Sequence, residues 1–391
     1  MAVAGRPPRG RVESPRVATP TDRSTTGTTL KLTREPFGAT PDGTAVDRWT
    51  LANDRGMEAR ILTYGGILQS LEVPDRDGQR ANVTLGFATL DGYLAGGNPA
   101  RFGALIGRYA NRIARGRFTL DGTTYRLARN EPPNSLHGGG QGFDRRVWQA
   151  TVAPGEQQQE VGVRLVYVSP DGEEGFPATL TATVTFTLDN HDRLRLDYQA
   201  TTAPGDPATV VNLTNHSYWQ LGGEGSGTVY DYRLWLNAAS YTPVDETAIP
   251  TGEILPVAGT PLDFTQPRPL GQRIREAHPQ LLIGQGYDHN YVLNRPSPAD
   301  GSLIRAATVH DPASGRTLTV ETTQPGLQVY TANHLDGTAV GSGGRAYRQS
   351  DALALEAQHY PDSPNQPGFP SVVLRPGEVY QATTVYRFSA G

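Results

Sequence analysis

The chain contains no cysteine and no long apolar segment. Its 391 residues include 0 cysteines and only 2 methionines. The absence of cysteine excludes disulfide bonds and thiolate chemistry. No uninterrupted apolar run approaches the roughly 18 residues that a membrane-spanning helix needs. We therefore expect no membrane span and no membrane partner.

An excess of charge of one sign is also lacking. Lys and Arg number 35 and Asp and Glu 39, which gives a net charge of -4 at pH 7. This balance gives no general attraction to nucleic acid, so we expect no nucleic-acid partner. Residues 1–28 are rich in Arg, Pro, Thr, Ser and Gly and predict a disordered N-terminal tail. Because no hydrophobic segment follows the early arginines, we expect a cytoplasmic location, with secretion after removal of a signal as the alternative.

Turns and strands dominate what is present. The chain has 45 glycines and 31 prolines, and a helical pattern appears only around residues 270–277. The clearest strand spans residues 180–188, where apolar residues occupy one face and threonines the other. Residues 189–192 then make a turn into a second alternating strand, which predicts a hairpin with one solvated face. No repeat or linker-like composition interrupts residues 29–391, so we predict one domain there, a large antiparallel β-sandwich.

Two segments carry candidate acid–base groups. His216 follows the strand-like residues 209–213, and an imidazole whose pKa lies near neutrality suits an acid or a base. Glu356 lies in a strand-like segment, on the face opposite Leu353 and Leu355 and beside small alanines. That arrangement leaves room for a ligand next to a carboxylate whose pKa burial would raise. A core histidine and a solvated glutamate on an edge strand are the simpler interpretations. Residues 362–370 follow as a rigid loop that could wall the groove.

Three further segments carry polar side chains suited to ligand binding. Asn111 and Arg112 can donate several hydrogen bonds to hydroxyl groups, with a surface turn as the alternative. His137 precedes three glycines, which indicates a close backbone approach or simply a flexible loop. Asp288 precedes a strand and could accept two hydroxyls of a sugar, or start a turn. The eight histidines form no H-x-H or H-E-x-x-H pattern, so we expect no metal site.

Taken together, these segments resemble the aldose 1-epimerase (galactose mutarotase) family. The resemblance covers about residues 30 to 390 in the family's order, and it rests on residues 107–108 with 110–113, 134–139, 214–218, 286–290, 323–331, and 355–367 with 374–378. One departure is Trp219-Gln220, where many members have Phe-Asn. We expect this pair to change a contact behind or at the edge of the sugar groove.

The resemblance implies a galactose mutarotase-like β-supersandwich. It also implies an isomerase that interconverts the α and β anomers of free aldoses such as glucose and galactose by acid–base ring opening and closure. Glu356 then looks like the general base and His216 like the general acid. The positions that look like sugar-binding or site-bordering residues are Asn111, Arg112, His137, Tyr218, Asp288 and Gln328. No cofactor is implied, the partner is a monosaccharide, and we expect a monomer or weak dimer.

The implied mechanism sets a condition on pH. It needs Glu356 ionised and His216 protonated, so a flat pH–rate profile from about pH 4 to 9 would contradict the assignment. Three alternatives stay open. A glycoside hydrolase would use Asp288 and Glu356 across a glycosidic bond. A carbohydrate-binding module would bind sugar without needing an acid–base pair. The third alternative is an enzyme that acts on a phosphorylated sugar. A dense cluster of Arg and Lys near these motifs would favour it, and the sequence shows none.

Overall fold

Strands dominate the structure, as the sequence predicted. The computed structural model describes residues 1–2, 30–98, 100–153, 159–297 and 299–391. The tail expected at residues 1–28 lies outside these ranges apart from residues 1 and 2. Within them, α-helix is confined to α1 (Leu90–Leu94) and α2 (Pro279–Gly284). None of the helices in the described part of the chain has the length and apolar character needed to span a bilayer.

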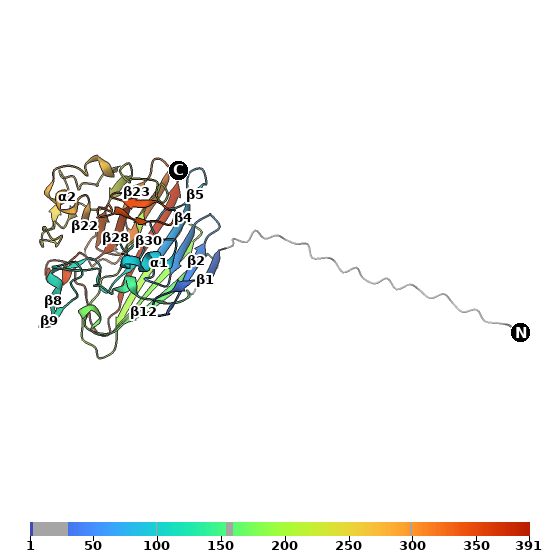
Figure 1. Ribbon diagram of the computed structural model, residues 1–391, viewed down its shortest axis with the longest axis horizontal. Coiled ribbons are helices and arrows are strands. Elements are labelled where there is room, and N and C mark those ends of the chain that lie inside the picture. Colours follow the sequence, from blue (N-terminus) through green and yellow to red (C-terminus); the bar gives the residue numbers. More distant parts are fainter. Residues whose placement is uncertain (3–29, 99, 154–158, 298) are drawn as a thin grey trace.

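The longest strands form a nine-stranded sheet within the described residues, and they run side by side across the molecule in Figure 1. Neighbouring strands are antiparallel throughout it. In spatial order the strands are β11 (Gln149–Val152), β12 (Glu160–Ser169), β13 (Leu180–Asp189), β14 (Arg193–Thr202), β30 (Tyr380–Ala390), β24 (Arg316–Thr322), β23 (Ile304–His310), β18 (Arg233–Leu236) and β21 (Arg268–Pro269).

Two smaller sheets are also antiparallel in the described ranges. A five-stranded sheet contains β1 (Lys31–Ala39), β2 (Ala45–Ala52), β3 (Glu58–Leu62), β4 (Leu68–Pro74) and β5 (Arg80–Asn82), in that order. A six-stranded sheet has the order β17 (Tyr218–Trp219), β28 (Leu353–Gln358), β25 (Gly326–Tyr330), β22 (Asp288–Val292), β19 (Ser240–Tyr241) and β20 (Leu255–Pro256).

Short strand pairs and 3-10 turns complete the described part of the chain. The pairs are β6 (Leu105–Ile106) with β16 (Thr214–Asn215), β7 (Arg112–Ile113) with β10 (Ser135–Leu136), β8 (Arg117–Leu120) with β9 (Thr123–Arg126), β15 (Thr209–Val210) with β29 (Val373–Leu374), and β26 (Asp336–Val340) with β27 (Ala346–Arg348). The 3-10 turns are Ala95–Gly97, Ala114–Gly116, Phe143–Arg145, Glu173–Gly175, Leu270–Gln272 and Ser363–Asn365.

One hydrophobic cluster joins the three larger sheets. It contains Phe186 of β13 from the nine-stranded sheet and Leu71 of β4 from the five-stranded sheet. Leu327 of β25 and Leu355 of β28 add side chains of the six-stranded sheet to the same cluster. Sheets that share one core in this way make a β-sandwich, which confirms the predicted fold class.

Two local predictions have different outcomes. Residues 180–188 do form a strand, β13, which pairs with β14 through a turn, so the hairpin is confirmed. The helix suggested around residues 270–277 is wrong, because only the 3-10 turn Leu270–Gln272 forms there. The α-helix begins later, at Pro279, a residue whose fixed φ suits the first turn of a helix.

Truncating the core face of β13 should cost far more stability than truncating its solvated face. Phe186 is 0% exposed, so Phe186→Ala removes buried apolar surface and leaves a cavity, costing about 3–5 kcal/mol. Thr185 on the other face is the matched control, and Thr185→Ala should cost about 1 kcal/mol or less. Urea unfolding followed by tryptophan fluorescence measures both, and equal losses would show that the two faces are not distinguished by burial.

Candidate active site

The alternation of β28 places Glu356 on a cavity. Leu353, Leu355 and Ala357 belong to the shared core, as the sequence predicted. Glu356 projects from the opposite face, where it lines a cavity of about 410 Å³. The register of the sheet sets Gln328 of β25 directly across from Glu356. The face of the six-stranded sheet that lines the cavity therefore carries the polar groups, because the other face packs into the core.

Short strand pairs bring two histidines to the same cavity. His216 follows β16 directly; its backbone N–H donates to the carbonyl of Ala104 at 2.8 Å, and its carbonyl accepts from Gly103 N–H at 3.0 Å. His137 follows β10, and its N–H donates to the carbonyl of Asn111 at 3.0 Å. Both histidines are therefore held by their backbones as well as by packing.

The loop after His137 makes the close backbone approach that its glycines predicted. His137 has φ 53° and Gly138 has φ 83°, both in the left-handed region. A Cβ atom at Gly138 would collide with the carbonyl oxygen of Gly107. Glycine is required there because the two backbone segments touch.

Seven of the eight site residues predicted from the sequence line this cavity. They are Asn111, Arg112, His137, His216, Tyr218, Asp288 and Glu356. Gln328 is not among the described lining residues; it lies behind Asp288, and its Nε2 donates to Asp288 Oδ1 at 2.7 Å. The structure thus brings together residues from motifs that span more than half of the chain.

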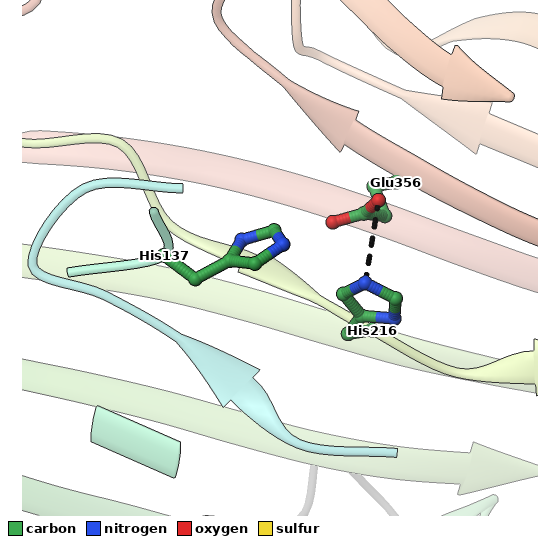
Figure 2. Close-up of side chains that lie close together, drawn as sticks. All are labelled: His137, His216 and Glu356. Carbon is green, nitrogen blue, oxygen red and sulfur yellow. Dashed lines mark ion pairs between the residues drawn. The ribbon is translucent and has the colours of Figure 1, made fainter. Parts of the chain in front are cut away.

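Glu356 and His216 form a close, buried pair. His216 Nε2 lies 3.7 Å from Glu356 Oε1. Figure 2 shows the two side chains pointing toward one another. Glu356 is 2% exposed and His216 is 5% exposed. The His216 ring stacks on Tyr218, with centroids 5.0 Å apart and planes 25° from parallel. Glu356 Oε2 has no hydrogen-bond partner within the described ranges. An acid–base pair with a free acceptor therefore faces the cavity.

Burial pushes both members of the pair toward their neutral forms. The pKa of Glu356 is raised to about 8, chiefly by burial and in part by Asp288, although Arg101 and Arg112 act to lower it. Burial also lowers the pKa of His216 to about 3, and Arg101 acts in the same direction. The neutral pair that burial favours near pH 7 is the reverse of the charged pair expected from the sequence. Both forms hold one proton in total, so they belong to the same protonation state of the pair.

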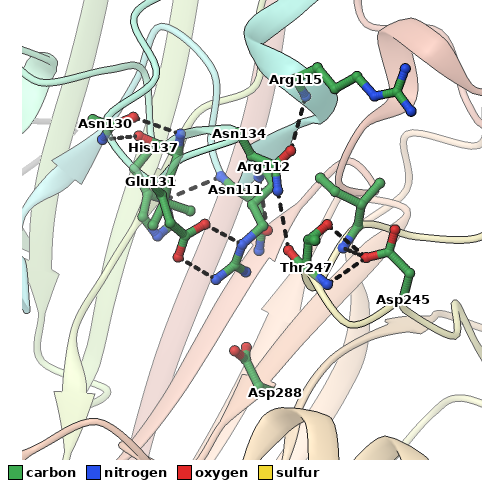
Figure 3. Close-up of polar contacts among 12 residues, drawn as sticks. Asn111, Arg112, Arg115, Asn130, Glu131, Asn134, His137, Asp245, Thr247 and Asp288 are labelled. Atoms are coloured by element: carbon green, nitrogen blue, oxygen red, sulfur yellow. Dashed lines mark hydrogen bonds and ion pairs between the residues drawn. The ribbon is translucent and has the colours of Figure 1, made fainter.

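The opposite wall of the cavity holds hydrogen-bonding groups in fixed positions. Arg112 donates through Nε and Nη2 to the two carboxylate oxygens of Glu131 at 2.6 and 2.8 Å. Figure 3 shows the Asp288 carboxylate pointing toward this pair. Asn111 N–H donates to His137 Nδ1 at 3.1 Å, so a neutral His137 carries its proton on Nε2 and can donate into the cavity. Donors and acceptors of this kind suit a molecule with several hydroxyl groups.

Three charged lining residues were missed by the sequence analysis: Asp336 at the start of β26, Glu131 and Arg101. Glu131 precedes the recognised segment 134–139, and Arg101 precedes the segment that begins at residue 107. Each is a single charged residue in an irregular turn, so periodicity gives no signal for it. Only the positive φ of Arg101, 54°, marks it as unusual, and that is visible in the structure alone.

Three side chains of the cavity, those of His137, His216 and Glu356, could together bind a cation. Donor atoms of His137, His216 and Glu356 all lie within 4.8 Å of one another. Sequence motifs gave no metal pattern because the three residues come from separate segments. The proposed acid–base pair uses the donor atoms of two of these residues, His216 and Glu356.

The contact expected from Trp219-Gln220, behind the groove or at its edge, does not lie at the edge. The Trp219 indole packs in the core against Tyr386, with ring centroids 4.8 Å apart, and Trp219 is not among the described residues that line the cavity. Gln220 is buried and donates to the carbonyls of Gly227 and Asp351 at 2.6 Å each. The loop at residues 362–370, which was expected to wall the groove, does not line this cavity. Its residues Asp362, Asn365 and Gln366 instead line a separate cavity of about 520 Å³.

Comparison with known proteins gives a consistent result. The family model for aldose 1-epimerase matches residues 47–387. The galactose mutarotase of Rattus norvegicus is 45% identical over 361 residues, which is 92% of this chain and 99% of that protein. The aldose 1-epimerase of Escherichia coli K12 is 39% identical over 352 residues, covering 90% and 97%.

A solved structure agrees with the fold. The crystal structure of galactose 1-epimerase from Lactobacillus acidophilus aligns with a TM-score of 0.79 at 28% identity, covering 93% of this chain and 100% of that one. The sequence match, the shared β-sandwich and the buried Glu356–His216 pair all support membership of the same family. The chain belongs to the aldose 1-epimerase family, isomerases that act on carbohydrates.

Proposed function

We propose that the protein interconverts the α and β anomers of free aldoses, galactose and glucose among them, with Glu356 as general base and His216 as general acid. The observation that carries this assignment is the 3.7 Å separation of Glu356 Oε1 and His216 Nε2. The two oxygens that must lose and gain protons, O1 and O5, are bonded to the same carbon of the sugar. Groups that serve both oxygens must therefore be neighbours, as these two are.

Ring opening needs one proton to leave the sugar and another to arrive. Glu356 accepts the proton of the O1 hydroxyl, and the electrons of that bond form the C1=O1 double bond. The C1–O5 bond breaks at the same time, and O5 takes a proton from His216 Nε2. The products are an open-chain aldehyde, a protonated Glu356 and a neutral His216, so atoms and charge balance. A positioned acid and base each contribute about 10²–10⁴-fold to such a step.

Ring closure on the other face completes the exchange. Rotation about the C1–C2 bond presents the opposite face of the aldehyde to O5. O5 then attacks C1 and returns its proton to His216, while O1 takes the proton back from Glu356. The pair ends in its starting state, so no cofactor, redox partner or phosphoryl donor enters the cycle.

The other lining residues are proposed to hold the sugar in place. Asp288 can accept hydrogen bonds from hydroxyl groups, while Arg112 and His137 Nε2 can donate them. Gln328 fixes the Asp288 carboxylate by its 2.7 Å hydrogen bond. Tyr218 supports the His216 ring by stacking. The expectations of a monomer or weak dimer and of a cytoplasmic location stay predictions.

Replacing the base should abolish catalysis and leave the fold intact. Glu356→Gln keeps the size of the side chain but removes its ability to accept the O1 proton, so kcat should fall about 10²–10⁴-fold. Polarimetry on freshly dissolved α-D-glucose and α-D-galactose measures this directly. Glu321→Gln, the same chemical change on β24, should behave as wild type. If wild type instead releases reducing sugar from a disaccharide without accelerating anomerisation, a glycoside hydrolase becomes the better assignment.

The pH dependence should report the single proton that the pair holds. Below about pH 3 both groups are protonated and no base remains, and above about pH 8 both are deprotonated and no acid remains. We therefore expect kcat/KM to be level between these limits and to fall as the pH rises through about 8. Initial rates corrected for uncatalysed mutarotation in the same buffers test this. A level profile that continues past pH 9 would contradict the assignment.

Removing the charge of Asp288 should weaken sugar binding more than it slows chemistry. Asp288→Asn keeps an oxygen that can accept from Gln328 Nε2, so the local hydrogen bond survives. Hydrogen bonds to charged groups contribute about 1.5–3 kcal/mol, so KM should rise about 10- to 100-fold. Steady-state kinetics with galactose separates KM from kcat. An unchanged KM would exclude a direct contact between Asp288 and the substrate.

A further inference from the structure

Arg101 lies in the cavity wall on a tight turn that is tied to the proposed acid. Arg101 N–H donates to the carbonyl of Asn98 at 2.8 Å, and Ala104 N–H donates to the carbonyl of Arg101 at 3.1 Å. The far end of this turn, Gly103 and Ala104, makes the two backbone hydrogen bonds to His216 described above. The position of Arg101 is therefore coupled through a few backbone atoms to the position of His216.

A buried carboxylate forms an ion pair with the guanidinium of Arg101. Arg101 Nε lies 3.6 Å from Asp144 Oδ2, and the two side chains are 14% and 3% exposed. Arg145 Nε approaches the same oxygen at 3.9 Å. Arg145, however, is not among the described residues that line the cavity, whereas Arg101 is. Two arginines thus share one carboxylate, and one of them faces the acid–base pair.

Arg101 is the cation that acts on both members of the pair. It favours the ionised form of Glu356 and disfavours protonation of His216. Arg112 also acts on Glu356, but it is bonded to Glu131 on the opposite wall. Besides the pair itself, the titratable and charged groups that line the cavity or act on the pair, among the described residues, are Arg101, Arg112, Glu131, His137, Tyr218, Asp288, Tyr330, His334, Asp336 and Tyr386.

We infer that Arg101 is a positioning residue for the proposed reaction: held by Asp144, it places a fixed positive charge beside both Glu356 and His216 and thereby sets the pH range in which the pair holds one proton. The inference rests on the proposed function. Arg101 acts through the pair and has no proton-transfer role of its own.

The inference has a signature that a structural role lacks. Arg101 lowers the pKa of Glu356 and the pKa of His216, so its removal raises both. The level part of the pH profile then moves to higher pH at both ends. A general structural defect would instead lower kcat/KM equally at every pH, and loss of a sugar contact would raise KM without moving either end.

The test compares pH profiles of kcat/KM for wild type, Arg101→Met and Arg101→Lys, measured by polarimetry with galactose. In Arg101→Met the basic limb should lie at higher pH than in wild type. The ratio of variant to wild-type kcat/KM should then rise about threefold or more between pH 7 and pH 9.5. Arg101→Lys keeps the charge and should return the limb to the wild-type position.

Arg145→Met is the matched control, because it removes the other arginine beside Asp144 and should leave the limb in place. An unmoved limb in Arg101→Met, or an equal shift in Arg145→Met, would overturn the inference while leaving the proposed function standing. If Arg101→Met does not fold, Arg101→Gln replaces it, with the thermal unfolding midpoint confirming its fold. If the wild-type protein does not catalyse mutarotation, the proposed function is wrong, and the inference about Arg101 is wrong with it.

Discussion

Burial of one carboxylate at the back of a core strand is the constraint on which the rest of the site depends. Glu356 occupies β28 between Leu355 and Ala357, whose side chains belong to the core shared by three sheets. Because side chains alternate along a strand, packing those neighbours inward leaves Glu356 no direction but the cavity. The free energy of the core therefore fixes where the Glu356 carboxylate points. A one-residue slip of β28 would exchange the two faces and lose both the core and the site.

An ionisable group at this depth needs partners whose charges nearly cancel. Asp288 favours the protonated form of Glu356, while Arg101 and Arg112 favour the ionised form. Each arginine is in turn held by a carboxylate, Arg112 by Glu131 and Arg101 by Asp144. Because positive and negative groups are paired in this way, their charges partly offset one another at the cavity. That balance suits a neutral sugar better than a charged one.

Much of this arrangement could be predicted from the sequence. The apolar-polar alternation of residues 180–188 and 353–357 is visible in the residues themselves, and both segments form the strands predicted. Recognition of the family's segments supplied seven of the cavity-lining residues. Arg101 and Glu131 could not be found in this way, because single charged residues in turns leave no periodic pattern. The sequence could not decide whether the Trp219 indole lies behind the groove or at its edge, because its face depends on the register of β17 with β28, which no local pattern reveals.

The preference of the buried cavity for a neutral pair bears on the proposed ring opening. In that mechanism Glu356 gains a proton and His216 loses one, so the open-chain aldehyde lies beside the neutral pair. Burial favours the neutral form of both groups, in the resting protein as well as beside the aldehyde. Forming the charged pair that begins the proposed reaction therefore costs free energy, because it moves both groups against desolvation. The same desolvation then favours the proton transfers of ring opening, since they return the pair to its neutral form. The cost of charging the pair and the driving force for opening thus have one origin, the burial of Glu356 and His216.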